Sequence, residues 1–322
     1  MHSAAAAIIF SLMALGQTTS DLDIVSTAKS PDDLARYLRS HTNIDWKALR
    51  RALGLKESEY WLAPCGSNFP VAKAPCSVNI EAVAKPDQVI IAIRGDELAY
   101  TVEYLRYLKD SRGGWKFAGE NSAFQRNSPS SHRIVRFWNK PFLLISSDLS
   151  QIGMATQQKL EEWFDLTRSD LDPVFSVTVD GGEWRFGLGV GRTIHATYTL
   201  PQTAGIERIE LTLDVSFDGV GLDQRDSFLG LYERRTNENG FTLRKAYLGS
   251  DRRTSMSTKD FQELADPFSG VPNEKLLVYA LPGLRKIAVG SDGNAKDWLR
   301  SVLDYAKDTQ EKRALLALLA NR

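Results

Sequence analysis

The sequence is poor in the residues that usually carry chemistry, and it has no surplus of either charge. Its 322 residues include two cysteines and four histidines, and 40 Lys and Arg balance 40 Asp and Glu. A nucleic-acid-binding protein usually has a basic surplus, because contacts to phosphate supply most of its affinity. Acidic disordered tails lie far from neutrality. We therefore expect a folded protein that binds no nucleic acid.

Long apolar runs are scarce too. The stretch at residues 4–15, AAAAIIFSLMAL, is too short to cross a bilayer but suits the apolar part of an export signal. Small residues at Ala14 and Gly16 favour cleavage after Gly16, although no Lys or Arg precedes the stretch. A buried N-terminal helix is the alternative. We predict a signal peptide at 1–16 and a secreted or periplasmic mature chain without an integral membrane segment.

The only two cysteines, Cys65 and Cys76, lie in a stretch rich in proline and glycine. Two cysteines at this spacing close a small loop in an oxidising compartment. Closing such a loop contributes roughly 3 kcal/mol to stability. A redox or metal site is the weaker alternative, because the spacing is not C-x-x-C and no histidine is near. We predict a structural disulfide.

The usual catalytic signatures are missing: the sequence contains no H-E-x-x-H, G-x-S-x-G or P-loop motif. No local pair of histidines starts a zinc site, so neither a cofactor nor a metal is expected. His132 and His195 are the candidates for a catalytic base. Each is predicted at a solvated strand position, and the sequence shows no partner that would orient its ring as a general base requires. We therefore expect both to be ordinary surface histidines.

Three alternating glycines, Gly187, Gly189 and Gly191, look at first like a dinucleotide-binding loop. Arg192 stands where G-x-G-x-x-G has its third glycine, and a strand rather than a helix follows. On a predicted strand over 184–190 the glycines share one face. They leave a bare strip that a helix, a ring or a ligand can approach. We expect internal packing there, with a ligand groove as the alternative.

Four tryptophans, Trp115, Trp138, Trp163 and Trp184, fall in predicted strands. An exposed row of such rings on a sheet can bind carbohydrate. Aromatic side chains more often pack between sheets, because they dominate buried area. We expect core packing, and carbohydrate binding is the alternative.

Hydrophobic periodicity predicts a mainly β fold, an antiparallel meander of two packed sheets or blade-like hairpin groups with α-helical segments at both ends. The clearest strand is 209–217, where apolar and polar residues alternate. Turn sequences such as Asp180-Gly181-Gly182 favour hairpins. Further strands are predicted at 89–93, 134–138, 142–146, 174–179, 184–190 and 194–200, and the ambiguous segment 97–109 is also assigned to a strand.

Helix start signals occur near both ends of the chain. Ser30 followed by Pro31 begins one predicted helix, and a second is expected to end at Gly54. Either Ser257 or Thr258 is the predicted cap of one C-terminal helix, and Asn294 and Thr309 are the predicted caps of two more. The predicted organisation is a signal peptide at 1–16, an N-terminal helical segment at 17–60, an antiparallel β core with one disulfide loop at 61–250, and a C-terminal helical segment packed on that core at 251–322.

These features favour an exported, non-catalytic binding or scaffold protein of the cell envelope or exterior over an enzyme. A hydrolase with a site assembled from distant residues, such as His132 or His195 beside an acid, is the first alternative. A carbohydrate-binding module is the second. The expected partner is a small molecule, a glycan or an envelope protein.

Overall fold

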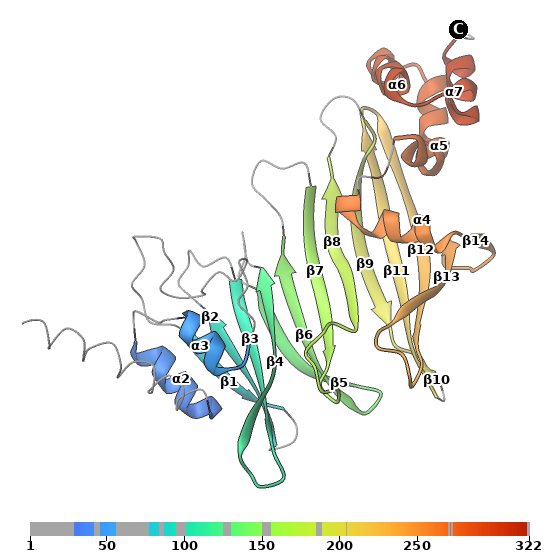
Figure 1. Cartoon of the computed structure of the whole chain (residues 1–322). Helices are drawn as coiled ribbons and strands as arrows, with labels where there is room; N and C mark the ends of the chain where they lie inside the picture. The colour runs from blue at the N-terminus through green and yellow to red at the C-terminus, as the bar shows by residue number, and fades with distance from the viewer. Residues whose placement is uncertain are drawn as a thin grey trace, which may run out of the picture. The chain divides into compact units, whose positions relative to one another are not determined.

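The fold comes from a computed structural model, which describes residues 29–41, 46–55, 77–83, 87–94, 101–124, 130–149, 156–184, 189–203, 205–269, 271 and 273–320. The chain forms two compact units (Figure 1). The first unit comprises Met1–Gln125 and Asp165–Asp172, and the second comprises Arg126–Phe164 and Pro173–Arg322. The predicted signal peptide and the predicted disulfide between Cys65 and Cys76 lie outside the described residues.

A four-stranded antiparallel sheet with helices on one face forms the first unit. Leu34 and Leu38 of the first helix and Leu49 of the second pack against Ile91 and Tyr107 of the sheet. The strands are ordered β1-β2-β3-β4. The elements are α2 (Pro31–Ser40), α3 (Trp46–Ala52), β1 (Ser77–Ala82), β2 (Gln88–Arg94), β3 (Thr101–Lys109) and β4 (Trp115–Phe124).

Two predictions for this unit are confirmed. Helix α2 begins after Ser30, whose Oγ accepts a hydrogen bond from the N–H of Asp33 at 3.2 Å, and Pro31 takes the first helical position. The ambiguous segment 97–109 contains a strand, β3, which pairs with both β2 and β4.

A buried arginine holds a loop from the middle of the chain within the first unit. The Arg106 side chain is 2 % exposed, and its guanidinium donates to the carbonyls of Leu166 at 2.7 Å, Arg168 at 2.7 Å and Asp170 at 3.0 Å. Burial lowers the pKa of Arg106. The segment Asp165–Asp172 thus belongs to the first unit, although the chain on either side of it belongs to the second.

The second unit is built on a large antiparallel sheet, ordered β14-β13-β12-β11-β9-β8-β7-β6-β5, with β10 paired to β11. The mainly β, antiparallel prediction is therefore confirmed. The strands are β5 (Ser131–Phe137), β6 (Lys140–Asp148), β7 (Thr156–Asp165), β8 (Phe175–Glu183), β9 (Gly191–Thr199), β10 (Gln202–Thr203), β11 (Ile206–Gly219), β12 (Leu222–Arg234), β13 (Thr242–Leu248) and β14 (Thr254–Met256).

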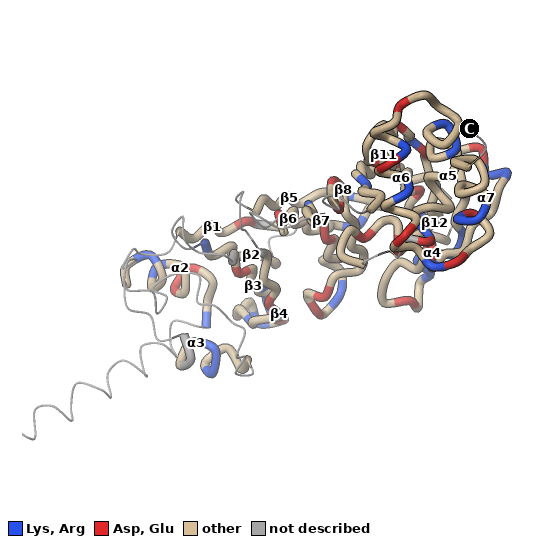
Figure 2. Tube along the Cα trace, turned by 90° about the horizontal axis from the view of Figure 1, so that it is seen from above, with Lys and Arg blue, Asp and Glu red and all other residues tan. Residues whose placement is uncertain are grey.

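One face of this sheet carries the core and the other is polar. Along β11 the predicted alternation holds, since Ile209, Leu213 and Phe217 are buried on one face while Asp214 on the other is exposed. Charges of both signs are interspersed along the strands and helices of this unit (Figure 2). No helix in the described part of the chain is both long enough and apolar enough to cross a membrane.

Helices cover the apolar face and one end of the large sheet (Figure 1). Ser257 caps α4 as predicted, and the Oγ1 of Thr309 accepts from the N–H of Lys312 at the start of α7. The cap of α6 is Asp292 and not Asn294, because the Asp292 carboxylate accepts from two free N–H groups. The long helix α5 was not among the predicted elements. The helices are α4 (Thr258–Ala265), η1 (Pro267–Ser269), α5 (Asn273–Val289), α6 (Gly293–Tyr305) and α7 (Gln310–Ala320).

The structure corrects the prediction for residues 180–190. Asp180-Gly181-Gly182 is not a turn, because β8 continues through it, and Gly182 pairs with Gln157 of β7 and Thr193 of β9. Glu183 then pairs with Arg192, so the residues between them connect two strands. The predicted strand over 184–190 is consequently wrong for its described residues 184, 189 and 190.

Candidate binding groove

A groove lies on the apolar face of the large sheet, beside α4 and η1. Its volume is about 720 Å³, within the range of sites that hold drug-sized molecules. Its lining includes Phe175 of β8, Leu211 of β11 and Tyr232 of β12. Phe241 and Phe268 of η1 also line it.

Aromatic rings lead across the sheet into this groove. The centroids of Phe137 and Trp163 are 4.9 Å apart, and Trp163 is 5.1 Å from Phe175. Phe175 in turn is 5.1 Å from Tyr232 and 5.8 Å from Phe241. The three contacts of Phe175 are edge-on, whereas Phe137 and Trp163 are tilted at 36°. Edge-on ring contacts stabilise such an array beyond the area that they bury. The groove therefore has a firm aromatic wall supplied by separate strands.

A buried arginine fixes the roof of the groove. The Arg192 side chain is fully buried, and its guanidinium donates to the carbonyls of Glu263 at 2.8 Å, Leu264 at 3.2 Å and Asp266 at 2.7 Å. It also reaches the Oγ of Ser269 at 3.3 Å. These carbonyls end α4 and have no partner within the helix. One side chain of β9 thus anchors both α4 and η1 to the sheet.

Two glycines let the roof lie close to the strands. A Cβ on Gly230 of β12 would lie 2.6 Å from the ring of Phe261 in α4. A Cβ on Gly181 of β8 would lie 3.2 Å from Pro267 of η1 and 2.8 Å from the carbonyl oxygen of Gln157. A strand glycine often marks such a close approach. The position of α4 and η1 therefore depends both on the hydrogen bonds of Arg192 and on having glycine at these two strand positions.

None of the groove's described lining residues is Lys, Arg or His. The lining residues with polar side chains are Gln158, Ser176, Thr178, Tyr232, Gln262 and Asp266. Gln158 Nε2 donates to Thr178 Oγ1 at 2.7 Å, so these two partly satisfy each other. The carboxylate of Asp266 accepts from the N–H of Phe268 at 2.9 Å. Burial raises the pKa of Tyr232 to about 12, so its hydroxyl stays protonated at neutral pH. The groove can thus donate hydrogen bonds but offers no positive charge.

A buried carboxylate supports the aromatic wall next to the groove. Glu161 of β7 is 6 % exposed and accepts from Trp163 Nε1 at 2.8 Å and from the Tyr198 hydroxyl at 2.8 Å. Arg133 of β5 adds a third bond at 3.1 Å. The negative charge of Glu161 is thereby hydrogen-bonded and paired, as a buried carboxylate requires.

The two candidate histidines lie away from the groove. His195 is on the polar face of β9, with its Nδ1 2.7 Å from Oδ1 of Asp180, and both side chains are about half exposed. This is the contact that orients a general base, but neither residue lines the groove. His132 lies in β5 and pairs with Ile145 of β6. The structure therefore does not bring the two histidines together at a concave site.

The glycine and tryptophan candidates are also dispersed. Gly187 lies outside the described residues, Gly189 precedes β9, and Gly191 is its first residue, so the described pair does not line one strand face. Trp163 is fully buried, in line with the core packing that we expected for it. Trp138 occupies a two-residue turn with φ of +47°, just after β5, and Trp184 follows β8. Trp115 belongs to the first unit, where Lys109 Nζ lies 4.9 Å from its ring.

Sequence reasoning missed the residues that shape the groove. In the sequence, Arg192 stands out only because it occupies the third-glycine position of G-x-G-x-x-G, and its partners lie more than seventy residues away along the chain. In the described part of the chain no group of three or more His, Cys, Asp or Glu is placed to hold a metal ion. Comparison with protein-family models, curated proteins and solved structures found no match to this chain.

Proposed function

We propose that the protein is an exported, non-catalytic binding protein of the cell envelope or exterior, whose second unit holds an uncharged apolar molecule in the groove beside α4 and η1. The observation that carries the proposal is the groove itself, an aromatic-walled space of about 720 Å³ under an anchored roof. Export rests on the apolar stretch at residues 4–15.

The charge of the ligand follows from the lining. Asp266 is the one carboxylate among the described lining residues of the groove, and none of those residues is a cation. An anionic ligand would lose its hydration without gaining a partner, which is costly. A neutral molecule avoids that cost, gains contact with Phe175, Phe241 and Phe268, and can accept a hydrogen bond from the Tyr232 hydroxyl.

Binding of the neutral, polarity-sensitive dye Nile red to the full mature chain tests the proposal. We expect saturable binding with blue-shifted emission. Phe268 is 44 % exposed, so Phe268→Ala should keep the fold. It removes one wall and should weaken dye binding by roughly five- to thirtyfold. Ala265→Trp, which fills the groove, should abolish binding.

Leu248→Ala is the matched control, because Leu248 is 43 % exposed on β13 and does not line the groove. It should leave the dye affinity unchanged. Non-saturable dye binding, or equal affinities of the wild type and the Phe268→Ala and Ala265→Trp variants, would contradict the proposal. Circular dichroism of each variant checks that the fold is kept.

A further inference from the structure

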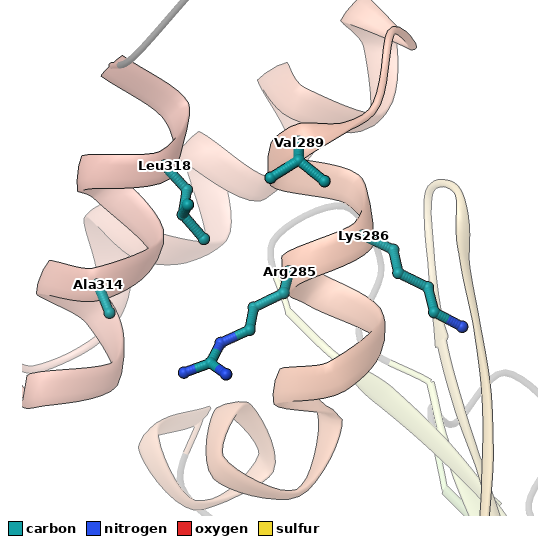
Figure 3. Close-up of a pocket in the computed structure, with 5 residues that line it drawn as sticks. All are labelled: Arg285, Lys286, Val289, Ala314 and Leu318. Carbon is teal, nitrogen blue, oxygen red and sulfur yellow. The ribbon is translucent and has the colours of Figure 1, made fainter.

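A second cavity lies between α5 and α7, apart from the groove on the sheet. Its volume is about 530 Å³, and it is lined by Arg285, Lys286 and Val289 of α5 and by Ala314 and Leu318 of α7 (Figure 3). The two cavities share no lining residue. An inference from this one is therefore independent of the function proposed above.

The helix sequences explain why the space is open. Leu315 and Leu319 of α7 are buried and hold that helix to the rest of the unit. Ala314, one residue earlier, has too short a side chain to fill the gap that it faces (Figure 3). On α5, Arg285 and Val289 are four residues apart and so share one helix face. An apolar wall and a cation are thereby presented side by side.

The apolar wall remains in contact with solvent. Val289 is 46 % exposed, and Leu318 on the opposite helix is half-buried. Figure 3 shows these two side chains facing each other across the cavity. An aliphatic chain placed between them would bury surface on both helices, which is favourable at about 25 cal/mol per Å².

The cation at the cavity has no acidic partner in the described part of the chain. Arg285 extends from α5 toward α7, whereas the Lys286 ammonium points away on the other side of α5 (Figure 3). Leu281 and Val289, four residues on either side of Arg285, cannot neutralise it. Arg300 and Arg313 on the neighbouring helices, by contrast, both pair with aspartates.

We propose that this cavity binds a small anionic amphiphile, a carboxylate with an aliphatic tail. The Arg285 guanidinium pairs with the carboxylate, for which its planar fork is well matched. The tail lies between Val289 and Leu318. The sheet groove differs in charge, because its described lining residues include the carboxylate of Asp266 and no Lys, Arg or His.

Calorimetric titration of the full mature chain with three ligands of equal tail length tests the proposal: octanoate, octanol and octyltrimethylammonium. We expect octanoate to bind at least about tenfold more tightly than either of the others, because a charge-assisted hydrogen bond is formed only with the anion. Arg285→Gln should remove the preference for octanoate over octanol. Val289→Ser should weaken both ligands.

Lys307→Gln is the matched control, since it removes the same charge at an exposed position between α6 and α7 that does not line the cavity. It should retain most of the preference for octanoate. Equal losses in the Arg285→Gln and Lys307→Gln variants would indicate general surface charge and overturn the proposal, as would equal affinity of wild type for octanoate and octanol.

A second copy of the chain is the other conceivable occupant. Light scattering across a range of protein concentrations distinguishes it. Self-association that Val289→Ser abolishes, without any octanoate preference in the wild type, would overturn the proposal. Nile red affinity should be the same in Arg285→Gln as in the wild type, so failure at this cavity and failure at the sheet groove are separable.

Discussion

The guanidinium of Arg192 in β9 donates a 2.7 Å hydrogen bond to the backbone carbonyl of Asp266, the residue that ends α4. Because Arg192 is fully buried and also binds the carbonyls of Glu263 and Leu264, its loss removes several hydrogen bonds at once, although Ser269 still donates to Glu263 and Asp266. A lost hydrogen bond costs about 0.5–1.5 kcal/mol, and a buried acceptor left without a donor costs about 1–3 kcal/mol. We expect Arg192→Leu to lower the free energy of unfolding by about 3 kcal/mol or more in urea titrations.

Arg192→Lys should be nearly as damaging, because an ammonium cannot span the same carbonyls as a planar fork. Arg225→Leu, at an exposed position of β12, is the control and should change stability by less than about 0.5 kcal/mol. Equal stability of Arg192→Leu and Arg225→Leu would show that the roof is held by other contacts.

The carboxylate of Glu161 should be the most sensitive polar position in the aromatic wall. Glu161→Leu leaves Trp163 Nε1 and the Tyr198 hydroxyl without their acceptor. We expect a loss of about 1–3 kcal/mol for the buried indole N–H, together with a shift of tryptophan emission. Tyr198→Phe removes a single donor and should cost less. If it costs as much, Glu161 does not organise the wall.

Glu162 makes the free energy of unfolding depend on pH, and the direction of its pKa shift fixes the sign of that dependence. Burial raises the pKa of Glu162 above its ordinary 4.5. A carboxyl with a higher pKa in the folded than in the unfolded state binds more protons when folded, so the free energy of unfolding falls as pH rises through the interval above 4.5. We expect Glu162→Gln to be more stable than the wild type at about pH 7 and to flatten that slope. Asp223→Asn, at an exposed position, should do neither.

Gly219 is the point at which α6 meets the β11–β12 hairpin. A Cβ there would lie 2.1 Å from the ring of Trp298, whose side chain is 8 % exposed. We expect Gly219→Ala to destabilise the protein by about 1–3 kcal/mol in thermal unfolding. The penalty should shrink in a Trp298→Leu background, and a double-mutant cycle measures the coupling. Gly293→Ala is the control and should be tolerated, because a Cβ added at Gly293 would have no atom within 4 Å apart from its chain neighbours and its own helix backbone.

Two predictions concern residues outside the described part of the chain. Cleavage after Gly16 would give a mature chain that begins at Gln17, which N-terminal sequencing of the exported protein can check.

A disulfide between Cys65 and Cys76 would leave no free thiol in the intact protein. Replacing both with serine should cost roughly 3 kcal/mol. Two thiols that react with iodoacetamide in the native exported protein would rule the disulfide out.

Local patterns were sufficient for the elements with a clear period or cap. The alternation over 209–217 and the Ser30-Pro31 start both describe the structure, because each depends on neighbours in the sequence. The sequence predicts a turn at Gly181-Gly182, because glycine pairs between apolar rows favour turns. In the structure, pairing to strands on both sides and the approach of Pro267 explain them instead.

The groove could not be read from the sequence for a related reason. Its aromatic wall needs Phe175, Tyr232 and Phe241 to meet, and only strand order and register decide that. The strand glycines at which η1 and α4 approach the sheet closely are Gly181 and Gly230. No local signal separates these glycines, or a buried arginine such as Arg192, from exposed ones.

Arg106 has a consequence for how the protein is made. Its three carbonyl partners lie in Asp165–Asp172, so the first unit cannot complete its hydrogen bonds when residue 125 leaves the ribosome. The first unit can form these hydrogen bonds only after β5, β6 and β7 have been synthesised, and these strands belong almost wholly to the second unit. Vectorial synthesis therefore cannot finish one unit before starting the next, and a chain truncated after residue 125 would leave Arg106 buried without acceptors or force it out into water.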